Sequence, residues 1–396
     1  MNLSDLKRNS YMLHGPLSKR GYMRWWHSFS GVNTLTGDTR TFFVEFYVIN
    51  PALGRTRPIL GQHPYFKKRG MRPSYVMIKA GVFPDENNKF GKQIHAFYPI
   101  SSLQTTGSPL VMRVGKASTV KTGFSENGGR RGECFYSESR ISGFVEVDLP
   151  KARHRSLMTD AGFMEWDLEV SKAVSGHTGF LGGRLSQSLH LLDSYWHGEG
   201  IRSFFRGSVT LDGDTYDVLP DLSYGYADKH WGHCFNHPWF QFACGKLISG
   251  RTGSELRHSV LTAGSFCPRF LCFHLRRRFM LQLTYMGEDF EFKRCKWEVK
   301  ESDRRFIWHI SAQNKTASVK LSGSCRKKDM MHLKYEDPDG KLPSLPLWAG
   351  AEGVGTLQLY RKNGGRELLD TLKLEKALCI YREEPHSASP GTNSSK

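Results

Sequence analysis

The sequence lacks the features that mark zinc-binding, secreted or membrane-spanning proteins. Its eight cysteines lie far apart without a C-x-x-C pair, so we expect packed, reduced thiols and no structural zinc site. The opening stretch MNLSDLKRNSYMLHG has no apolar signal-peptide segment, and no apolar run approaches the roughly 18 residues of a membrane-spanning helix. We therefore expect a cytoplasmic protein, with at most a peripheral contact with a membrane.

Signatures of nucleophilic hydrolysis and of phosphate binding are missing as well. There is no G-x-S-x-G motif, and the glycine-containing stretch near Arg130 does not lie between a strand and a helix. A serine hydrolase or a nucleotide-binding enzyme is therefore not indicated.

Acidic residues are scarce relative to basic ones. The chain has 56 Lys and Arg against 38 Asp and Glu, a net charge of +18 and a pI of about 9.5, which attracts polyanions. The basic residues are spread along the chain and no nucleic-acid-binding motif accompanies them, so a basic solvated surface is favoured over a nucleic-acid site. Contact with an anionic membrane stays open, because the basic run Arg276–Arg278 follows F-L-C-F-H-L.

Amphipathic helical patterns are few, and strand patterns dominate. Residues 163–170 alternate cleanly, and residues 41–50 and 74–83 are rich in β-branched and aromatic residues. With 40 glycines and many turn signals between short strands, the chain is predicted to be all-β, with barrels or sandwiches and few short helices.

The length of 396 residues exceeds that of one ordinary core. We therefore expect two β domains, at residues 1–215 and 216–384, with a seam near residues 213–221. The tail, residues 385–396, has the composition of a disordered segment.

A dense polar motif, YADKHWGHCFNHPWF, spans residues 226–240. In an extended strand Tyr226, Asp228 and His230 share one face. An aspartate among aromatic rings in a barrel interior is desolvated, which raises its pKa and suits it to act as a general acid. His230 could instead keep Asp228 ionised through a charge-assisted hydrogen bond, and both possibilities are open.

Two other interpretations of this motif exist. Asp228 with His230, His233 and His237 could bind a metal, but the spacing matches no recognised metal motif, and no metal is expected. The polar residues could also simply satisfy a β-bulge and a loop.

A second group of residues surrounds the stretch GYMRWWHSF at residues 21–29. Trp25 and Trp26 are adjacent, so in a strand they point to opposite faces and only one can line a cavity. Glu45 lies in a strand that is apolar on both faces, beside Tyr47, and must be either paired or functional. A buried ion pair with Arg24 and a catalytic role are both open for Glu45.

These motifs together resemble those of the tocopherol cyclase family. Y-A-D-K-H-W-G at residues 226–232 resembles its Y-A-E-K-N-W-G motif, and W-F-Q-F-A-C at residues 239–244 resembles the W-F-W-A-Q-C segment that follows it. G-Y-M-R-W-W with the later V-I-N-P resembles the aromatic-rich opening and the E-N-P stretch of the family. Carotenoid hydratases and related lipocalin-like proteins have comparable elements.

The resemblance implies two consecutive lipocalin-like β-barrels with an apolar ligand site near their junction. It implies cofactor-independent chemistry, in which an acid protonates a prenyl double bond and a phenol or water captures the cation. Asp228 takes the acidic position of the motif, so it is the expected proton donor, assisted by Tyr226 and His230. The residues expected to bind the hydrophobic substrate are Trp25, Trp26, Glu45, Tyr47, Trp231, Trp239 and Gln241.

Three positions depart from the family motifs: His230 replaces asparagine, Arg24 replaces the glutamate before the tryptophan pair, and Gln241 replaces a tryptophan. These departures leave the substrate open between a prenylated quinol and another prenylated or polyene compound. A different class of function, a non-catalytic carrier of a terpenoid or lipid with a basic membrane-docking surface, is the alternative.

Overall fold

The structure is a computed structural model of the whole chain. It describes residues 9–54, 56–107, 109–115, 133–177, 192, 194–233, 240–266, 269–270, 273–274, 278–293, 295–340, 347–362 and 365–382.

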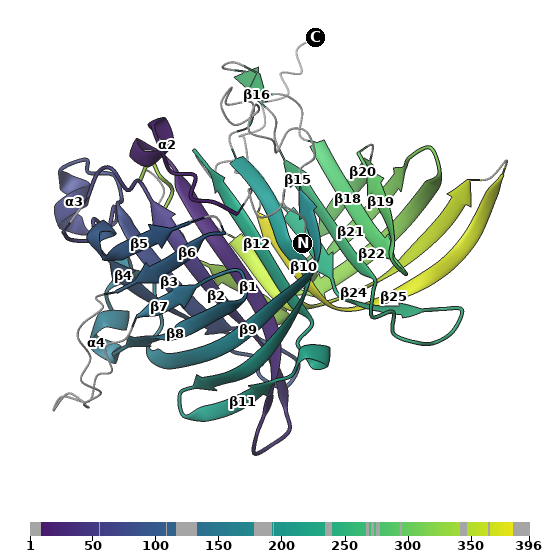
Figure 1. Cartoon of the computed structure of the whole chain (residues 1–396), viewed down its shortest axis with the longest axis horizontal. Helices are drawn as coiled ribbons and strands as arrows, with labels where there is room; N and C mark the ends of the chain where they lie inside the picture. The colour runs from purple at the N-terminus through teal and green to yellow at the C-terminus, as the bar shows by residue number, and fades with distance from the viewer. Residues whose placement is uncertain are drawn as a thin grey trace, which may run out of the picture.

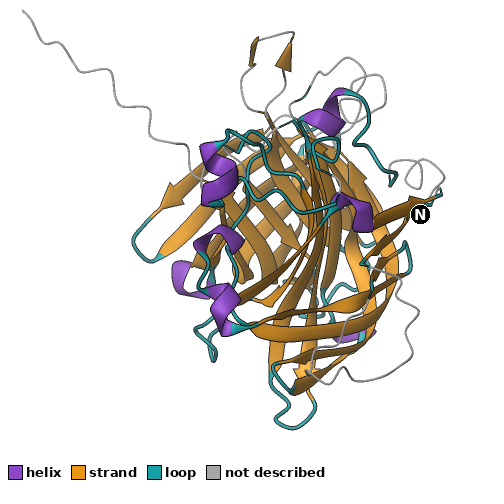
Figure 2. Cartoon of the chain, turned by 90° about the vertical axis from the view of Figure 1, so that its left-hand side faces the viewer, coloured by secondary structure: helices purple, strands orange, loops and turns teal. Residues whose placement is uncertain are grey.

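The predicted all-β class is confirmed. In the described ranges the α-helices are three single turns: α2 (Pro16–Lys19), α3 (Pro64–Lys68) and α4 (Leu149–Ala152). Short 3₁₀ turns lie at Ile100–Ser102, Arg155–Leu157, Pro220–Leu222 and Lys327–Asp329. Strands make up most of the remainder, and they curve into two barrel-like sheets (Figures 1 and 2).

The first sheet has twelve antiparallel strands in the order β4-β3-β2-β1-β11-β10-β9-β8-β7-β6-β5, with β12 paired to both β1 and β10. Its strands are β1 (Tyr22–Asn33), β2 (Thr39–Ile49), β3 (Tyr75–Val82), β4 (Lys92–Tyr98), β5 (Leu103–Thr106), β6 (Val111–Val114), β7 (Cys134–Tyr136), β8 (Arg140–Val147), β9 (Gly162–His177), β10 (Ser194–Leu211), β11 (Asp214–Val218) and β12 (Gly225–Gly232).

The second sheet has eleven strands, with the main order β19-β18-β15-β13-β25-β24-β22-β21-β20. Its strands are β13 (Phe240–Cys244), β14 (Lys246–Ser249), β15 (Val260–Phe266), β18 (Arg278–Tyr285), β19 (Glu288–Phe292), β20 (Cys295–Glu301), β21 (Arg305–Gln313), β22 (Ala317–Arg326), β23 (Met331–Leu333), β24 (Leu347–Lys362) and β25 (Arg366–Arg382). A separate small hairpin pairs β16 (Arg269–Phe270) with β17 (Phe273–His274).

The two sheets lie side by side, with the purple-to-teal first sheet on the left of Figure 1 and the green-to-yellow second sheet on the right. The chain passes from one to the other between Gly232 and Phe240, later than the expected boundary at residues 215 and 216, because β12 hydrogen-bonds to β1 and β10. Asp228 therefore belongs to the first sheet. The division into two folding domains stays a prediction, and the tail 385–396 lies outside the described residues.

Strand alternation divides the apolar side chains into three cores. Alternate residues of β1 such as Trp25 and Phe29 face the interior of the first sheet. The intervening residues, such as Tyr22 and Trp26, face a core between the two sheets, and a third core lies within the second sheet. The central strands of the first sheet are thus buried on both faces, which is why their sequences are apolar on both faces.

The pairing register brings polar residues into rows across this inter-sheet face. Trp26 lies opposite Asp228 on one side and Glu45 on the other, and Glu45 lies opposite Lys79 on β3. Arg24 lies one row away, between His230 and Tyr47. Directly opposed side chains on one face of a sheet are near neighbours, so the register places four charged groups together.

None of the helices in the described residues is long and apolar enough to span a membrane.

Candidate active site

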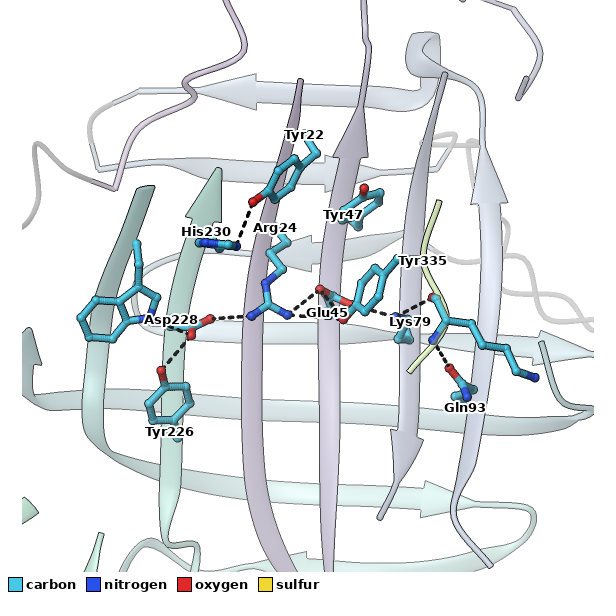
Figure 3. Close-up of polar contacts among 12 residues, drawn as sticks. Tyr22, Arg24, Glu45, Tyr47, Lys79, Gln93, Tyr226, Asp228, His230 and Tyr335 are labelled. Carbon is cyan, nitrogen blue, oxygen red and sulfur yellow. Dashed lines mark hydrogen bonds and ion pairs between the residues drawn. The ribbon is translucent and has the colours of Figure 1, made fainter. Parts of the chain in front are cut away.

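Asp228 lies in the middle of β12, with 1% of its surface exposed. Its Oδ2 atom accepts hydrogen bonds from the Tyr226 hydroxyl at 2.7 Å and from the Trp196 indole at 3.0 Å (Figure 3). The Oδ1 atom is buried and has no hydrogen-bond partner among the described residues. Its nearest cation is the Arg24 guanidinium, with Nη2 at 3.9 Å.

Burial controls the protonation of this carboxyl group. Desolvation raises the pKa of Asp228 above its ordinary value, although the Arg24 charge and the hydrogen bonds from Tyr226 and Trp196 act in the opposite direction. Because Oδ2 already accepts two donors, Oδ1 is the oxygen that would carry the proton. Burial therefore shifts Asp228 toward its neutral form relative to a solvent-exposed aspartate.

Asp228 is one end of a buried group that we call the outer array, formed by Asp228, Arg24, Glu45, Lys79 and Tyr335. Arg24 Nη1 lies 3.4 Å from Glu45 Oε1, and Lys79 Nζ lies 3.2 Å from Glu45 Oε2, with all three side chains fully buried. Figure 3 shows these residues as a row across β12, β1, β2 and β3. The ion pair between Glu45 and Arg24, one of the two interpretations of Glu45, is confirmed.

The outer array is closed from the side of the second sheet by Tyr335, which follows β23. The Tyr335 hydroxyl donates to Glu45 Oε2 at 2.9 Å, and its ring lies 3.2 Å from Lys79 Nζ. Lys79 also donates to the carbonyl of Lys334 at 3.1 Å. Burial lowers the pKa of Lys79 to about 8, against the opposing effect of Glu45. Arg24 and Lys79 both lie within 3.4 Å of the Glu45 carboxylate, so each of these three buried charges has an opposite charge near it, as buried charges require.

His230 is neutral in this environment. Burial and the neighbouring Arg24 charge lower the pKa of His230 well below its ordinary value. Its Nδ1 lies 3.0 Å from the hydroxyl of Tyr22, and the two rings meet edge to face. The charged neighbour of Asp228 is thus Arg24, and a neutral histidine does not supply the charge that would hold Asp228 ionised.

Four of the expected substrate-binding residues face the same inter-sheet space as Asp228: Glu45 of the outer array, Trp26, Tyr47 and Gln241. Trp26 stacks on Phe43 with ring centroids 5.0 Å apart, and the Tyr47 hydroxyl donates to the Glu336 carbonyl at 3.0 Å. Gln241 on β13 of the second sheet donates from its side-chain amide to the Tyr226 hydroxyl.

The other expected residues lie elsewhere. Trp25 and Trp231 belong to the core inside the first sheet, because alternation turns them to the opposite face of β1 and β12. His233 is half-buried, with its Nδ1 3.0 Å from the carbonyl of Arg20. Trp239 and His237 lie outside the described residues.

Sequence reasoning missed Trp196, Lys79 and Tyr335. Lys79 carried a usable signal, since it is a lone charge in the apolar strand S-Y-V-M-I-K-A-G-V-F, as Glu45 is in its own strand. Nothing in the sequence around Trp196 or Tyr335 indicates a role at the site, because only strand pairing and the contact between the sheets bring these residues to it.

The space beside Tyr226 is narrow. A cavity of about 20 Å³, with room for about one water molecule, lies between the sheets beside Tyr226. Small side chains, among them Ser28, Ser30, Ala243 and Ala351, line it together with Tyr226. Within the described residues, no three His, Cys, Asp or Glu side chains come together as a metal-binding group.

Comparison with known proteins identifies one family. The tocopherol cyclase-like family matches residues 188–371, which confirms the resemblance inferred from the motifs. The matched region contains Asp228 with its donors Tyr226 and Trp196, whereas Arg24 and Glu45 precede it. No curated protein matches this chain.

Two solved structures are similar to this chain over most of its length. One is an AttH protein from Nitrosomonas europaea, with 10% identity and a TM-score of 0.41, covering 93% of this chain and 97% of that one. The other is kievitone hydratase from Nectria haematococca, with 13% identity and a TM-score of 0.43, covering 93% of this chain and 90% of that one.

Proposed function

Taking the tocopherol cyclase-like match over residues 188–371 as the premise, we propose that the chain is a cofactor-independent acid catalyst of a hydrophobic prenylated, quinol-type substrate. Asp228 is the proton donor. The observation that carries this proposal is the state of Asp228 Oδ1, which is buried, has no hydrogen-bond partner among the described residues and belongs to a carboxyl group whose pKa is raised by burial.

The reaction follows from this arrangement. Asp228 Oδ1 transfers its proton to one carbon of a trisubstituted prenyl double bond, and the other carbon becomes a tertiary cation. The substrate's phenol oxygen then attacks the cation and closes a ring, and the phenol proton returns to the carboxylate. Water in place of the phenol gives hydration instead.

The outer array suits both states of the acid. Desolvation keeps the proton on Asp228 before the reaction, because the charged form is poorly solvated. After transfer, the carboxylate is stabilised by the donors Tyr226 and Trp196 on Oδ2 and by the Arg24 charge near Oδ1. The aromatic faces of Trp26 and Tyr22, in the same inter-sheet core, are positioned to stabilise a cation.

Substrate entry requires the contact between the sheets to widen. The cavity beside Tyr226 has room for about one water molecule, far less than a prenyl chain needs. Because small side chains line this cavity, a substrate chain that enters here displaces fewer atoms on its way toward Asp228. We therefore expect the apolar chain of the substrate to enter here, between β1 and β12 on one side and the second sheet on the other.

The test is the Asp228→Asn substitution, assayed with a polyprenylated hydroquinone and with a linear polyene, with products identified by liquid chromatography and mass spectrometry. Loss of general acid catalysis predicts a fall in turnover of about 10²–10⁴-fold, while the amide keeps the size and the two hydrogen bonds at Oδ2. Asp217→Asn, at an exposed position of β11, is the matched control and should keep full activity. Turnover by Asp228→Asn at the wild-type rate would refute the assignment.

A carrier of hydrophobic ligands is the second candidate, and the observation that favours it is the small hairpin of β16 and β17. Phe273 on this hairpin is 68% exposed, and the arginines 276–278 follow it in a chain of net charge +18. Such a protein would bind phosphatidylglycerol vesicles more strongly than phosphatidylcholine vesicles, with binding falling steeply as salt is added. It would also keep its extractable ligand in the Asp228→Asn variant, whereas equal binding to both kinds of vesicle would count against it.

A further inference from the structure

The interior of the first sheet holds a second group of buried charges, on the opposite face of β1 and β12 from Asp228. Lys172 Nζ lies 2.6 Å from Glu199 Oε2 and 2.8 Å from Glu138 Oε2. The Tyr136 hydroxyl donates to the same Glu199 oxygen at 2.9 Å. Lys229 is the fifth member of this inner cluster, which we define as Tyr136, Glu138, Lys172, Glu199 and Lys229.

Lys229 lies between two aromatic rings of the barrel interior. Its Nζ is 5.5 Å from the ring centroid of Trp25 and 4.8 Å from that of Trp231. Lys229 is the lysine of the Y-A-D-K-H-W-G motif, so alternation along β12 sends the aspartate of this motif to the outer array and the lysine to the inner cluster.

The segment Asn9–Leu13 occupies the space next to this cluster. Asn9 is 1% exposed, and its side-chain oxygen accepts from the Trp25 indole at 2.9 Å. Its amide group donates to the Tyr136 hydroxyl at 2.6 Å and to Glu138. The backbone carbonyl of Ser10 accepts from Lys229 Nζ, and Leu13 is 2% exposed in the same core.

This segment belongs to no strand or helix, so no ladder of backbone hydrogen bonds holds it in the barrel. The side-chain carbonyl of Asn9 accepts a hydrogen bond from Trp25 Nε1, and the backbone carbonyl of Ser10 accepts one from Lys229 Nζ. The apolar side chains of the segment fill the adjoining space. A small molecule with an acceptor head and an apolar body could meet the same requirements.

The charges of the cluster indicate the chemistry of that head. Glu138 and Glu199 directly contact Lys172, and Lys229, whose pKa burial lowers to about 7, adds no more than one further positive charge. The neighbouring His27 is neutral because burial lowers its pKa to about 3. An anionic head would unbalance the cluster, whereas an uncharged carbonyl keeps the balance and reproduces what Ser10 supplies. Glu199 Oε1 is buried without a hydrogen-bond partner among the described residues.

We propose that Asn9–Leu13 is a displaceable plug, and that the inner cluster with Trp25 and Trp231 is a second binding site, for an apolar molecule with an uncharged carbonyl head. The site is independent of Asp228 and of any reaction there. An ester, a ketone or a quinone carbonyl has the required chemistry.

The test loosens the plug in the full chain with Asn9→Ala and Leu13→Ala together, and measures binding of the methyl ester of cis-parinaric acid by its fluorescence. We expect the loosened variant to bind this ester at least tenfold more tightly than the wild type. His14→Ala, at the exposed position that follows the segment, is the control and should bind as the wild type does. Equal binding by the loosened variant and the wild type would overturn the proposal.

Two further comparisons identify the site and the head group. Lys229→Met in the loosened background should weaken ester binding at least fivefold, and unchanged binding would place the ester elsewhere and overturn the assignment. The free acid should bind the loosened variant more weakly than the ester does, and a preference for the acid would refute the uncharged head. If the double substitution prevents folding, judged by the thermal transition, Asn9→Ala alone provides the same comparisons.

Discussion

The two faces of β1 and β12 carry two buried charged groups of similar composition and different geometry. Each contains two basic and two acidic side chains, yet the distances between the basic and the acidic groups differ. In the inner cluster Lys172 contacts both glutamates at 2.6 and 2.8 Å. In the outer array the cation nearest to Asp228 is 3.9 Å away, and the direct contacts of Asp228 Oδ2 are with neutral donors.

This difference explains why the two faces suit different tasks. A carboxylate in direct contact with a lysine is held ionised, since protonation would sacrifice a charge-assisted hydrogen bond. In a carboxyl group that is equally buried but farther from its cation, the attraction of the cation offsets less of the desolvation penalty. The neutral form of the carboxyl group is then favoured. Distance from the cation, and not burial alone, thus selects Asp228 as the candidate acid.

The largest effect on stability is expected from removing one cation of each group. Arg24→Met leaves two fully buried carboxyl groups without their shared cation, and breaking a buried pair in this way costs about 3–5 kcal/mol. Lys172→Met is the matched change in the inner cluster, where Glu138 keeps a side chain that is 14% exposed and water relieves part of the penalty. Urea denaturation should therefore show the greater loss for Arg24→Met. Equal losses would contradict the contrast between the faces.

The pH dependence of stability that Lys229 contributes should be opposite in sign to the one that Asp228 contributes. Burial lowers the pKa of Lys229 to about 7, so above this pH the folded chain has released a proton that the unfolded chain still holds, up to about pH 10.5. The contribution of Lys229 to stability therefore rises with pH, by on the order of 3 kcal/mol between pH 7 and pH 9. Urea denaturation at pH 7, 8 and 9 should show that the free energy of unfolding rises with pH in the wild type and does not show this rise in Lys229→Met.

The contribution of Asp228 to stability changes with pH in the opposite direction. Its raised pKa means that the folded chain retains a proton which the unfolded chain has released, so its contribution to stability falls as the pH rises from the ordinary aspartate value to the raised one. Asp228→Asn should remove this fall and leave the alkaline rise of Lys229 unchanged. A variant that alters both parts of the curve would show that the two faces are electrostatically coupled.

A smaller loss of stability is expected when the Trp196 indole, which donates a hydrogen bond to Asp228, is removed. Trp196→Phe removes one hydrogen bond to Asp228 Oδ2, at a cost of about 1–2 kcal/mol. Because this donor lowers the pKa of Asp228, its loss should extend activity to higher pH. Trp166→Phe is the matched control, since the buried indole nitrogen of Trp166 has no hydrogen-bond partner among the described residues. An activity profile that moves equally in both variants would assign the shift to packing.

Much of the fold was predictable because strand alternation is local. The period of two residues identified the strands and placed Tyr226 and Asp228 on one face, where the Tyr226 hydroxyl donates to Asp228. The same period separated Trp25 from Trp26, which lie in different cores. The chain passes between the sheets after β12, later than the turn-rich stretch at residues 213–221, because turn residues do not reveal which sheet the next strand will join.

The candidate site was predictable only in part. A lone charge in an apolar strand must find a partner, so Glu45 was expected to have one, and Lys79 carried the same signal. Trp196 lies 32 residues from Asp228 and Tyr335 lies 290 residues from Glu45. Contacts at such separations depend on strand order and sheet packing, which no local pattern contains.

The sequence by itself determined the all-β class, the two-sided burial of the central strands and the face on which Asp228 lies, since each follows from residue type and a period of two. The tertiary structure decided that Asp228 belongs to the first sheet, that Arg24 is its nearest cation and that His230 is neutral. It also decided that the aspartate and the lysine of one short motif enter two different interiors. These outcomes depend on the register between strands and on the contact between sheets, because desolvation and charge pairing are set by what surrounds a side chain.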